Sequence, residues 1–233
     1  TSTPQAIAGG GRNPRPGEIT LAHKGVLFLD EMPEFARGSL EVLRQPLEDK
    51  QIQLSRASGT YVFPAGFILV AAMNPCPCGY YPDMNKCRCT PGEVSHYLHK
   101  LSQPLLERID LCADVPPVNF SQISGEKSGE SSALIRKRVE KARRIQQKRY
   151  QNEKICFNGE LSGKQIRKYC VLTENAFQVA KNAFELMELS ARSYHRILKV
   201  SRTIADMEGE ELIHTRHVAE ALTYKAFDKK YRS

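Results

Sequence analysis

The chain has 233 residues, of which 41% are hydrophobic, and it carries a formal net charge of +8 at pH 7. This length and composition predict a globular protein of one or two domains, and no apolar run reaches the roughly 18–20 residues that a membrane helix requires. No signal-peptide pattern opens the sequence, so we expect a cytoplasmic protein without a membrane partner, whose positive charge favours nucleic acid.

Residues 1–20 are predicted to form an exposed hairpin or loop. Its tip is residues 9–17, a stretch that is rich in glycine and proline and carries Arg12 and Arg15. Such residues suit a turn that brings backbone and guanidinium groups close to a partner. The alternative for the residues before about Ile19 is a frayed terminus.

Residues 24–31 place four apolar residues directly before Asp30 and Glu31. A short apolar run next to a glycine predicts a central strand of a parallel sheet, buried on both faces, and such sheets bind their ligands at the carboxyl ends of the strands. In phosphoryl-transfer sites the first acid of such a pair holds Mg²⁺ and the second polarises the attacking water. The alternative is a strand followed by an acidic helix start.

The next elements complete an α/β pattern. A helix is predicted over residues 39–49, then a hairpin whose strands, residues 51–55 and 60–63, flank the turn 56–59. A second apolar strand, residues 67–72, ends in Met73 and Asn74. The fold class is therefore predicted as α/β, with a parallel sheet and inserted hairpins.

Four of the seven cysteines lie close together in the sequence, as Cys76, Cys78, Cys87 and Cys89. Four thiols on two short loops can bind a tetrahedral Zn²⁺ ion, and a cytosolic location argues against disulfides. The C-x-C spacing is tighter than the usual C-x₂-C, so a site in which one pair stays free and a redox-active cluster remain alternatives.

The second half of the chain reads as helical. A helix over residues 93–101 leads into Arg108, and a flexible linker over residues 120–132 precedes a basic helix over residues 133–150 whose apolar stripe is expected to pack inward. The remainder is predicted as further helices, starting near Ser162, Thr173, Ser190 and Thr215.

The sequences of four segments resemble one family, the magnesium-chelatase-like AAA+ ATPases. Within that family they resemble the YifB/ComM subgroup, which is linked to competence and DNA branch migration. The segments are GGGRNPRPGEITLAHKGVLFLDEMPEF, NPCPCGYY, LLERIDL and SARSYHRILKVSRTIAD. The resemblance covers essentially the whole chain. It implies an ATPase that uses ATP and Mg²⁺, assembles as a homo-oligomeric ring, expected to be a hexamer, and acts on DNA.

The resemblance also implies roles for single residues. Asp30 would bind Mg²⁺, Glu31 would activate water and Asn74 would be the sensor-1 residue. Arg108 would be the arginine finger that reaches a neighbouring subunit's nucleotide, although an ion pair with Glu107 or Asp110 is the alternative explanation.

Two further sets of arginines receive roles in the same way. Arg192 matches the sensor-2 arginine that contacts nucleotide, and Arg196 is the reserve candidate. The hairpin of residues 51–63 corresponds to the pre-sensor-1 hairpin, which makes Arg56 a candidate DNA contact along with Arg12 and Arg15 of the N-terminal insert.

A phosphate-binding loop of the form G-x-x-x-x-G-K-S/T is missing from the sequence. That loop supplies the backbone N–H groups and the lysine that hold phosphates. Thr1 is therefore expected to lie inside the domain, as part of a longer ATPase, and the 233 residues alone are expected to be inactive.

The predicted organisation is part of an AAA+ core over residues 1–119, the linker 120–132 and a helical lid over residues 133–233. The rival from another functional class is a non-catalytic basic module, with or without zinc, that binds nucleic acid or a partner. A subunit of a true metal chelatase is the less favoured enzymatic alternative.

Overall fold

The computed structural model describes residues 3–57, 59–116, 118, 124 and 129–225. Thr1, the hairpin-tip residue Ser58, much of the predicted linker 120–132 and the end of the predicted lid after Lys225 lie outside the described residues. The chain forms two compact units, one running to Ile109 and the other beginning at Asp110.

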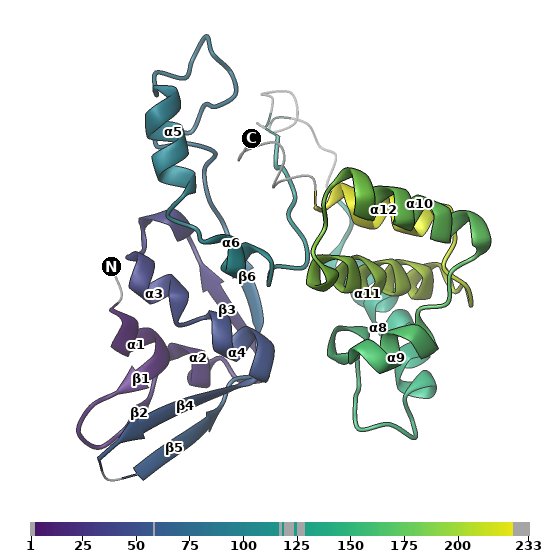
Figure 1. Ribbon diagram of the computed structural model, residues 1–233, viewed down its shortest axis with the longest axis horizontal. Coiled ribbons are helices and arrows are strands. Elements are labelled where there is room, and N and C mark those ends of the chain that lie inside the picture. Colours follow the sequence, from purple (N-terminus) through teal and green to yellow (C-terminus); the bar gives the residue numbers. More distant parts are fainter. Residues whose placement is uncertain (1–2, 58, 117, 119–123, 125–128, 226–233) are drawn as a thin grey trace. The chain divides into compact units, whose positions relative to one another are not determined.

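The first unit mixes short helices with three two-stranded sheets (Figure 1). Its elements in chain order are α1 (Pro4–Ala8), β1 (Gly9–Gly10), β2 (Arg15–Pro16), α2 (Glu18–Leu21), β3 (Val26–Leu29), the 3₁₀ turn η1 (Met32–Glu34), α3 (Arg37–Glu41), α4 (Arg44–Asp49), β4 (Gln51–Arg56), β5 (Gly59–Pro64), β6 (Ile68–Ala71), α5 (Pro91–Leu98) and α6 (Gln103–Leu106).

The two apolar strands pair in parallel, as predicted. Val26 of β3 is opposite Ile68 of β6, and the register continues to Leu29 opposite Ala71. Leu29 is buried in a core with Phe67 and residues of η1, α3 and α6. The predicted α/β class with a parallel sheet is therefore confirmed.

The prediction that this strand pair is covered on both faces is wrong for the described residues. Val26 is 57% exposed and Phe28 58%, and Ile68 and Val70 on the partner strand are 65% and 42% exposed. The alternate side chains Leu27 and Leu69 instead contact the core. Because successive side chains of a strand point to opposite faces, one face of this pair is packed and the other is open.

The N-terminal residues are anchored, which contradicts the alternative of a frayed terminus. Ile7 of α1 and Ile19 of α2 are 3% and 0% exposed, and the predicted hairpin forms between them as the β1–β2 ladder. Glycine is required where the chain crosses itself, because a Cβ atom on Gly9 would lie 2.3 Å from Arg15 O and one on Gly17 would lie 2.3 Å from Gly9 N.

The single helix predicted over residues 39–49 is two helices, α3 and α4, separated at Val42 and Leu43. The physical reason is Pro46, which cannot donate a backbone hydrogen bond and whose ring clashes with the carbonyl group four residues earlier. The predicted helix over residues 93–101 is likewise displaced, since α5 begins at Pro91 after a capping box between Thr90 and Glu93.

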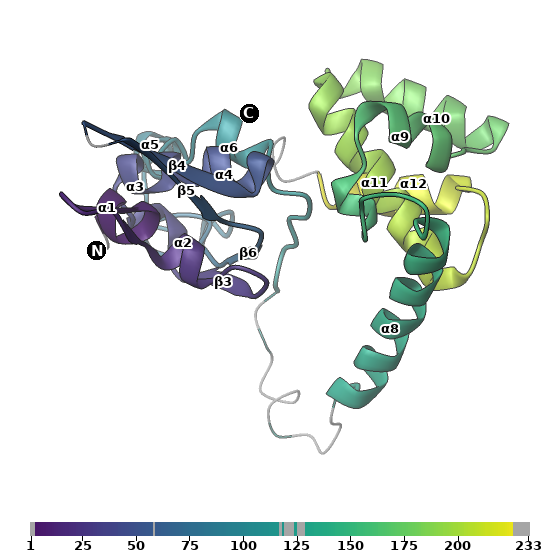
Figure 2. The same cartoon turned by 90° about the horizontal axis from the view of Figure 1, so that it is seen from below.

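The second unit is a helical bundle (Figure 2). Its elements are α8 (Ser132–Arg149), the 3₁₀ turn η2 (Asn158–Glu160), α9 (Gly163–Tyr169), α10 (Glu174–Leu186), α11 (Ala191–Glu208) and α12 (Thr215–Thr223). The predicted helix starts are confirmed, because side-chain oxygens of Ser162, Thr173 and Ser190 accept backbone N–H groups of the first turns. The bundle also includes the stretch after Asp110, where the Cys112 N–H donates to Tyr224 O at 3.0 Å.

A buried ionic cluster fixes α11 within this bundle. Asp206 is 0% exposed and accepts hydrogen bonds from Arg149 of α8, from Arg202 one turn away and from the Asn158 side chain. Arg202 is 1% exposed and also donates to the carbonyl groups of Glu210 and Glu211. Breaking a buried, fully bonded pair costs several kcal/mol, roughly 3–5, so the orientation of α11 is strongly fixed.

The inward stripe predicted along α8 is only half correct. Ala142 and Gln146 are buried, but Leu134, Ile135 and Val139 are 51%, 43% and 48% exposed. In the described part of the second unit only the later turns of α8 are packed, mainly against α11. Among the helices of the described residues, none combines the length and the apolar character that a bilayer crossing needs.

Candidate functional site

Backbone bonds around Ala72 bring the two predicted site segments together. The Ala72 N–H donates to Leu29 O at 2.9 Å, and Ala72 O accepts the Met32 N–H at 3.0 Å. Asp30 and Glu31, which follow β3, therefore lie at the same edge as Asn74, which follows β6, and all three side chains are exposed. This edge is the carboxyl end of the parallel pair, where α/β sheets bind ligands.

Glu31 has an unusual backbone conformation. Its φ and ψ are 49° and 47°, in the left-handed region, which costs a residue with a Cβ atom roughly 1–2 kcal/mol. The Glu31 N–H donates to Asp30 Oδ1 at 3.0 Å, and the buried side chains of Met32 and Pro33 hold the turn that follows. Within the described residues the Glu31 carboxylate makes no hydrogen bond or ion pair, so it is available to a ligand.

The end of α5 lies near this edge, which was not predicted. Burial raises the pKa of Tyr97, the negative charges of Glu34 and Glu31 add to that increase, and the nearby backbone of Asn74 opposes it. Lys100, just after α5, lies 3.7 Å from a carboxylate oxygen of Glu34. The acidic edge thus has a tyrosine and a lysine beside it, and no spacing in the sequence could have indicated these contacts.

The four clustered cysteines come together as predicted. Their ligand atoms all lie within 4.8 Å of one another, with Cys76 Sγ 3.4 Å from Cys78 Sγ and 3.8 Å from Cys87 Sγ. Cys76 is fully buried. Backbone hydrogen bonds from Tyr80 and Arg88 lower the pKa of Cys78 to about 6, whereas burial and the neighbouring thiols raise the pKa of Cys87 and Cys89. In the metal-free cluster the thiolate, the form that binds metals, is therefore favoured at Cys78 and disfavoured at Cys87 and Cys89.

Each of the other three cysteines lies apart from this cluster, as expected for plain thiols. Cys170 is buried, Cys112 is half-buried and Cys156 is exposed. Burial raises the pKa of Cys170 to about 11. A thiol with a raised pKa is protonated at neutral pH and is a poor nucleophile, so Cys170 does not have the environment of a reactive cysteine.

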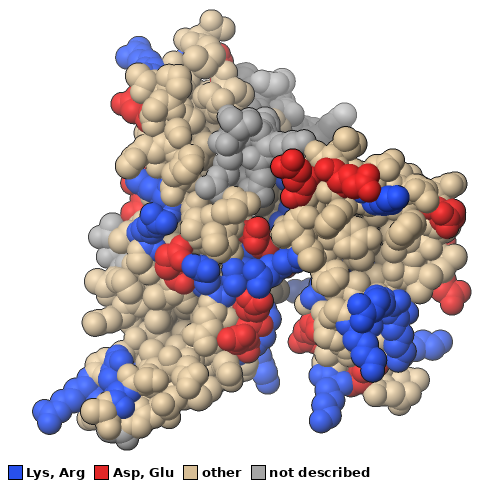
Figure 3. Space-filling model, in the orientation of Figure 1, with Lys and Arg blue, Asp and Glu red and all other residues tan. Residues whose placement is uncertain are grey.

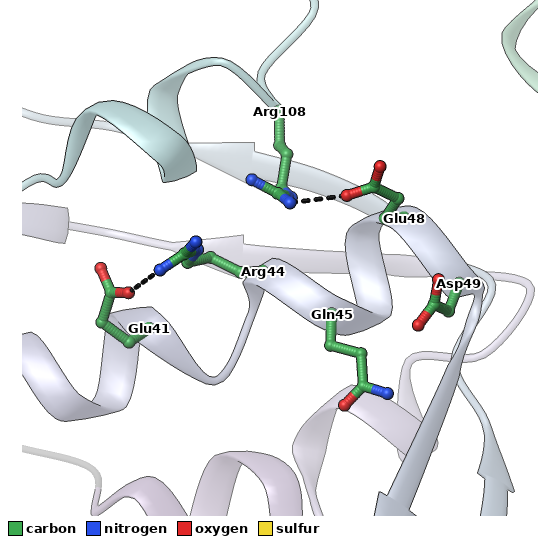
Figure 4. A pocket seen from close by; sticks show the side chains of 6 residues that line it. All are labelled: Glu41, Arg44, Gln45, Glu48, Asp49 and Arg108. Atoms are coloured by element: carbon green, nitrogen blue, oxygen red, sulfur yellow. Dashed lines mark hydrogen bonds and ion pairs between the residues drawn. The ribbon is translucent and has the colours of Figure 1, made fainter. Parts of the chain in front are cut away.

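Arg108 lines a polar pocket of about 370 Å³ on the first unit (Figure 4). Its guanidinium group donates to Glu48 of α4 at 2.6 Å and to Pro104 O at 2.5 Å, and its side chain is 10% exposed. The pocket is lined by Glu41, Arg44, Gln45, Glu48, Asp49 and Arg108. Sequence reasoning missed Glu48, which is 60 residues away from Arg108, and the role of Arg108 across a subunit boundary stays a prediction.

The two sensor-2 candidates belong to the second unit. Arg192 is exposed in the first turn of α11. Arg196, one turn later, pairs with Asp110 and its side chain is 16% exposed. Asp110, the predicted alternative partner of Arg108, is therefore engaged by Arg196, and nucleotide contact by either α11 arginine stays a prediction.

The two predicted DNA hairpins are joined by one side chain. Arg56, at the end of β4, donates from Nε to Gly11 O at 3.2 Å and from Nη1 to Ser55 O at 2.9 Å. Arg12 and Arg15 on the other hairpin are exposed. In Figure 3, Lys and Arg side chains gather at the lower left, where the tips of both hairpins lie in Figure 1, so this end of the first unit is basic.

Both units match known families. Residues 1–123 match the family described as magnesium chelatase, subunit ChlI. Residues 129–225 match the family described as magnesium chelatase, subunit ChlI C-terminal. The two matches meet within the predicted linker, at residues 123 and 129.

Curated bacterial proteins are similar over nearly the whole chain. The competence protein ComM of Haemophilus influenzae is 48% identical over 223 residues, which are 95% of this chain and 43% of ComM. The uncharacterized YifB proteins of Salmonella typhimurium and Escherichia coli are each 45% identical, over 96% of this chain and 44% of theirs. The chain thus spans less than half the length of these relatives.

The left-handed conformation of Glu31 leads to a first prediction. Glu31→Gly should be more stable than Glu31→Ala by roughly 1 kcal/mol, because both variants lose the carboxylate but only alanine keeps a strained Cβ atom. The free energy of unfolding in urea measures the difference. Glu34 of η1 is the control, since its φ is not positive, and there alanine should be the more stable variant. Equal stability of the two Glu31 variants would contradict the argument.

Proposed function

Because this chain belongs to the magnesium chelatase subunit ChlI family and resembles its ComM and YifB members, we propose that it forms part of a Mg²⁺-dependent ATPase, a cytoplasmic ring, expected to be hexameric, that remodels DNA. One observation carries the proposal: two carboxylates and a carboxamide, on Asp30, Glu31 and Asn74, are exposed together at the carboxyl edge of the β3–β6 pair.

The residues at this edge fit a Mg²⁺–nucleotide complex. Carboxylate oxygens are preferred Mg²⁺ ligands, and a bound Mg²⁺ ion would neutralise negative charge on the phosphate groups. Asp30 would hold the ion, Glu31 would orient and polarise the attacking water, and the Asn74 carboxamide would hydrogen bond to that water or to the terminal phosphate. The absence of protein partners on the described Glu31 carboxylate supports this assignment.

The arginines would complete the site. Arg108 carries a permanently charged, forked group suited to phosphate, and in the ring it would exchange its contact with Glu48 for the nucleotide of a neighbouring subunit. Arg192, with Arg196 as the second candidate, would contact the terminal phosphate from the lid. Without a G-x-x-x-x-G-K-S/T loop, the 233-residue chain alone should have no ATPase activity.

The intact ATPase, in which this chain is joined to a phosphate-binding loop, allows a direct test. Glu31→Gln should bind nucleotide and Mg²⁺ without hydrolysis, and Arg108→Ala should lose about 10³-fold in rate. A mixture of the two should recover activity, because a subunit with intact Asp30 and Glu31 can meet a neighbour with Arg108. Steady-state ATPase assays of each variant and of the mixture measure this.

The matched control for the mixing experiment is Arg37→Ala, which removes an exposed arginine of α3 outside the site and should leave the rate unchanged. If subunits exchange and no activity returns, Arg108 does not act across the boundary, and its pair with Glu48 is the better explanation. If the wild type has no ATPase activity at all, the proposed function itself fails.

DNA is the proposed substrate because the two basic hairpins lie side by side and the chain carries a net charge of +8. Arg12→Ala and Arg15→Ala should each weaken DNA binding and lower the slope of log affinity against log salt by about 0.9, the value for one lost phosphate contact on duplex DNA. Fluorescence anisotropy across a salt series measures this. Arg37→Ala is again the control, and an unchanged slope in both variants would exclude the hairpin as a contact.

Zn²⁺ is the second metal of the proposal, held by Cys76, Cys78, Cys87 and Cys89. Four sulfur atoms within 4.8 Å of one another match a closed four-thiolate structural site. Protein purified without chelator should contain about one zinc per chain by elemental analysis, and Cys156→Ser, outside the cluster, should not change that number. Folded protein with reduced thiols and no metal would refute the site.

A further inference from the structure

The cysteine cluster and α5 form a small core of their own at the end of the first unit. Cys76, Val94, Tyr97 and Leu98 are buried together, and the other three clustered cysteines pack against them. Figure 1 shows α5 and the loop before it projecting from the rest of the unit. Cys76, the first residue of this small core, lies two residues after Asn74. The segment that follows β6 therefore leads from Asn74 directly into the cluster.

One link between Asn74 and the cluster is the turn at Gly79. Gly79 has a φ of 83°, and its N–H donates to Cys76 O at 3.0 Å, which closes a tight turn around Cys78. A methyl group on Gly79 would lie 3.9 Å from both Cγ and Oδ1 of Asn74, an ordinary van der Waals distance. The backbone of the turn therefore lies directly beside the carboxamide of Asn74.

The second link comes from the other side of the cluster. Tyr97 is 5% exposed and packs in the same small core as Cys76, and its side chain also interacts with the backbone of Asn74. Asn74 thus lies next to the cluster on two sides: its carboxamide is beside the Gly79 turn, and its backbone is near the Tyr97 side chain.

The loop between Asn74 and α5 has little regular structure to hold this arrangement. Residues 75–89 form turns and bends with no helix or strand. The backbone–backbone hydrogen bonds within the loop are donated by Gly79, Asp83, Lys86 and Cys87, and each spans only three or four residues. A loop without ladder bonds opens easily unless side chains fix it. The four thiols are the groups that join its two ends, residues 76–78 and 87–89.

We propose that the metal ion held by the four thiolates is a positioning device for Asn74: it fixes the Gly79 turn and the Tyr97 contact, and through them the carboxamide at the edge of the β3–β6 pair. The role of Asn74 as a nucleotide sensor rests on the proposed function, whereas the mechanical link from metal to Asn74 does not. Neither Tyr97 nor the cysteines touch nucleotide in this proposal, so all act through Asn74.

The mechanical link is tested first in the wild-type 233-residue chain, by hydrogen exchange with and without a zinc chelator. Removing zinc should speed amide exchange of residues 72–79 about tenfold or more, leave the bundle from α8 to α12 unchanged, and be reversed by added Zn²⁺ or Co²⁺. Cys87→Ser/Cys89→Ser, which leaves residues 74–79 intact, should behave like the chelated protein, and Cys156→Ser should behave like the wild type. Unchanged exchange at residues 72–79 after zinc loss overturns the proposal, as does protein that never binds zinc.

The consequence for catalysis is tested in the intact ATPase by a double-mutant cycle. Cys87→Ser/Cys89→Ser should lower kcat on the order of 10²-fold, as expected for a displaced site residue, with little change in the KM for ATP. The same substitutions in an Asn74→Ala background should have almost no further effect, because the device has nothing left to position.

Tyr97→Phe distinguishes a loss of Asn74 positioning from a loss of the metal site itself. It should keep a full zinc complement and still lower kcat, but only when Asn74 is present. Multiplicative losses in either cycle would mean that the cluster does not act through Asn74, and would overturn the proposal while leaving the ATPase function intact. If the wild type has no ATPase activity, the proposed function fails, and the exchange measurement alone decides whether the metal holds Asn74.

Discussion

The arrangement of Asp30, Glu31 and Asn74 depends on the backbone groups of a single residue, Ala72. Its N–H and carbonyl groups bond to Leu29 and Met32, on either side of Asp30 and Glu31, so the last rung of the parallel ladder also closes the turn that carries the acids. Side chains from two strands meet at this edge because the strands run parallel and end at the same level. The left-handed backbone of Glu31 is unfavourable in free energy. The hydrogen bonds of Ala72 and the burial of Met32 and Pro33 offset that unfavourable term.

The features that could be predicted were those whose chemistry lies within a few residues. The strands β3 and β6 each follow from an apolar run that ends in polar groups, and the cysteine cluster follows from two close C-x-C pairs. The helix starts of the bundle follow in the same way, because a capping oxygen such as that of Thr173 acts on an N–H three residues later. Local rules sufficed wherever the interaction itself was local.

The features that escaped prediction depend on what packs against what. Arg108 meets Glu48 across 60 residues, and Tyr97 reaches Asn74 from a helix whose placement no spacing encodes. The open face of the β3–β6 pair also escaped prediction. An apolar run indicates that a strand can be buried, but it does not indicate which surface covers the strand. The break at Pro46 is different: a local rule existed there, and the apolar periodicity of residues 39–49 masked it.

The hydrogen bond from Arg56 to Gly11 links the two basic hairpins. One guanidinium group has a fixed number of N–H donors, and two of its nitrogen atoms are already committed within the protein. A phosphate that takes the Nε–H of Arg56 would therefore compete with the Gly11 carbonyl group, whereas one that binds at Nη2 would not. The contribution of Arg56 to DNA affinity would then be the free energy of its phosphate contact minus that of its contact with Gly11. An anion that displaced the Gly11 carbonyl group would remove the hydrogen bond between the two hairpins.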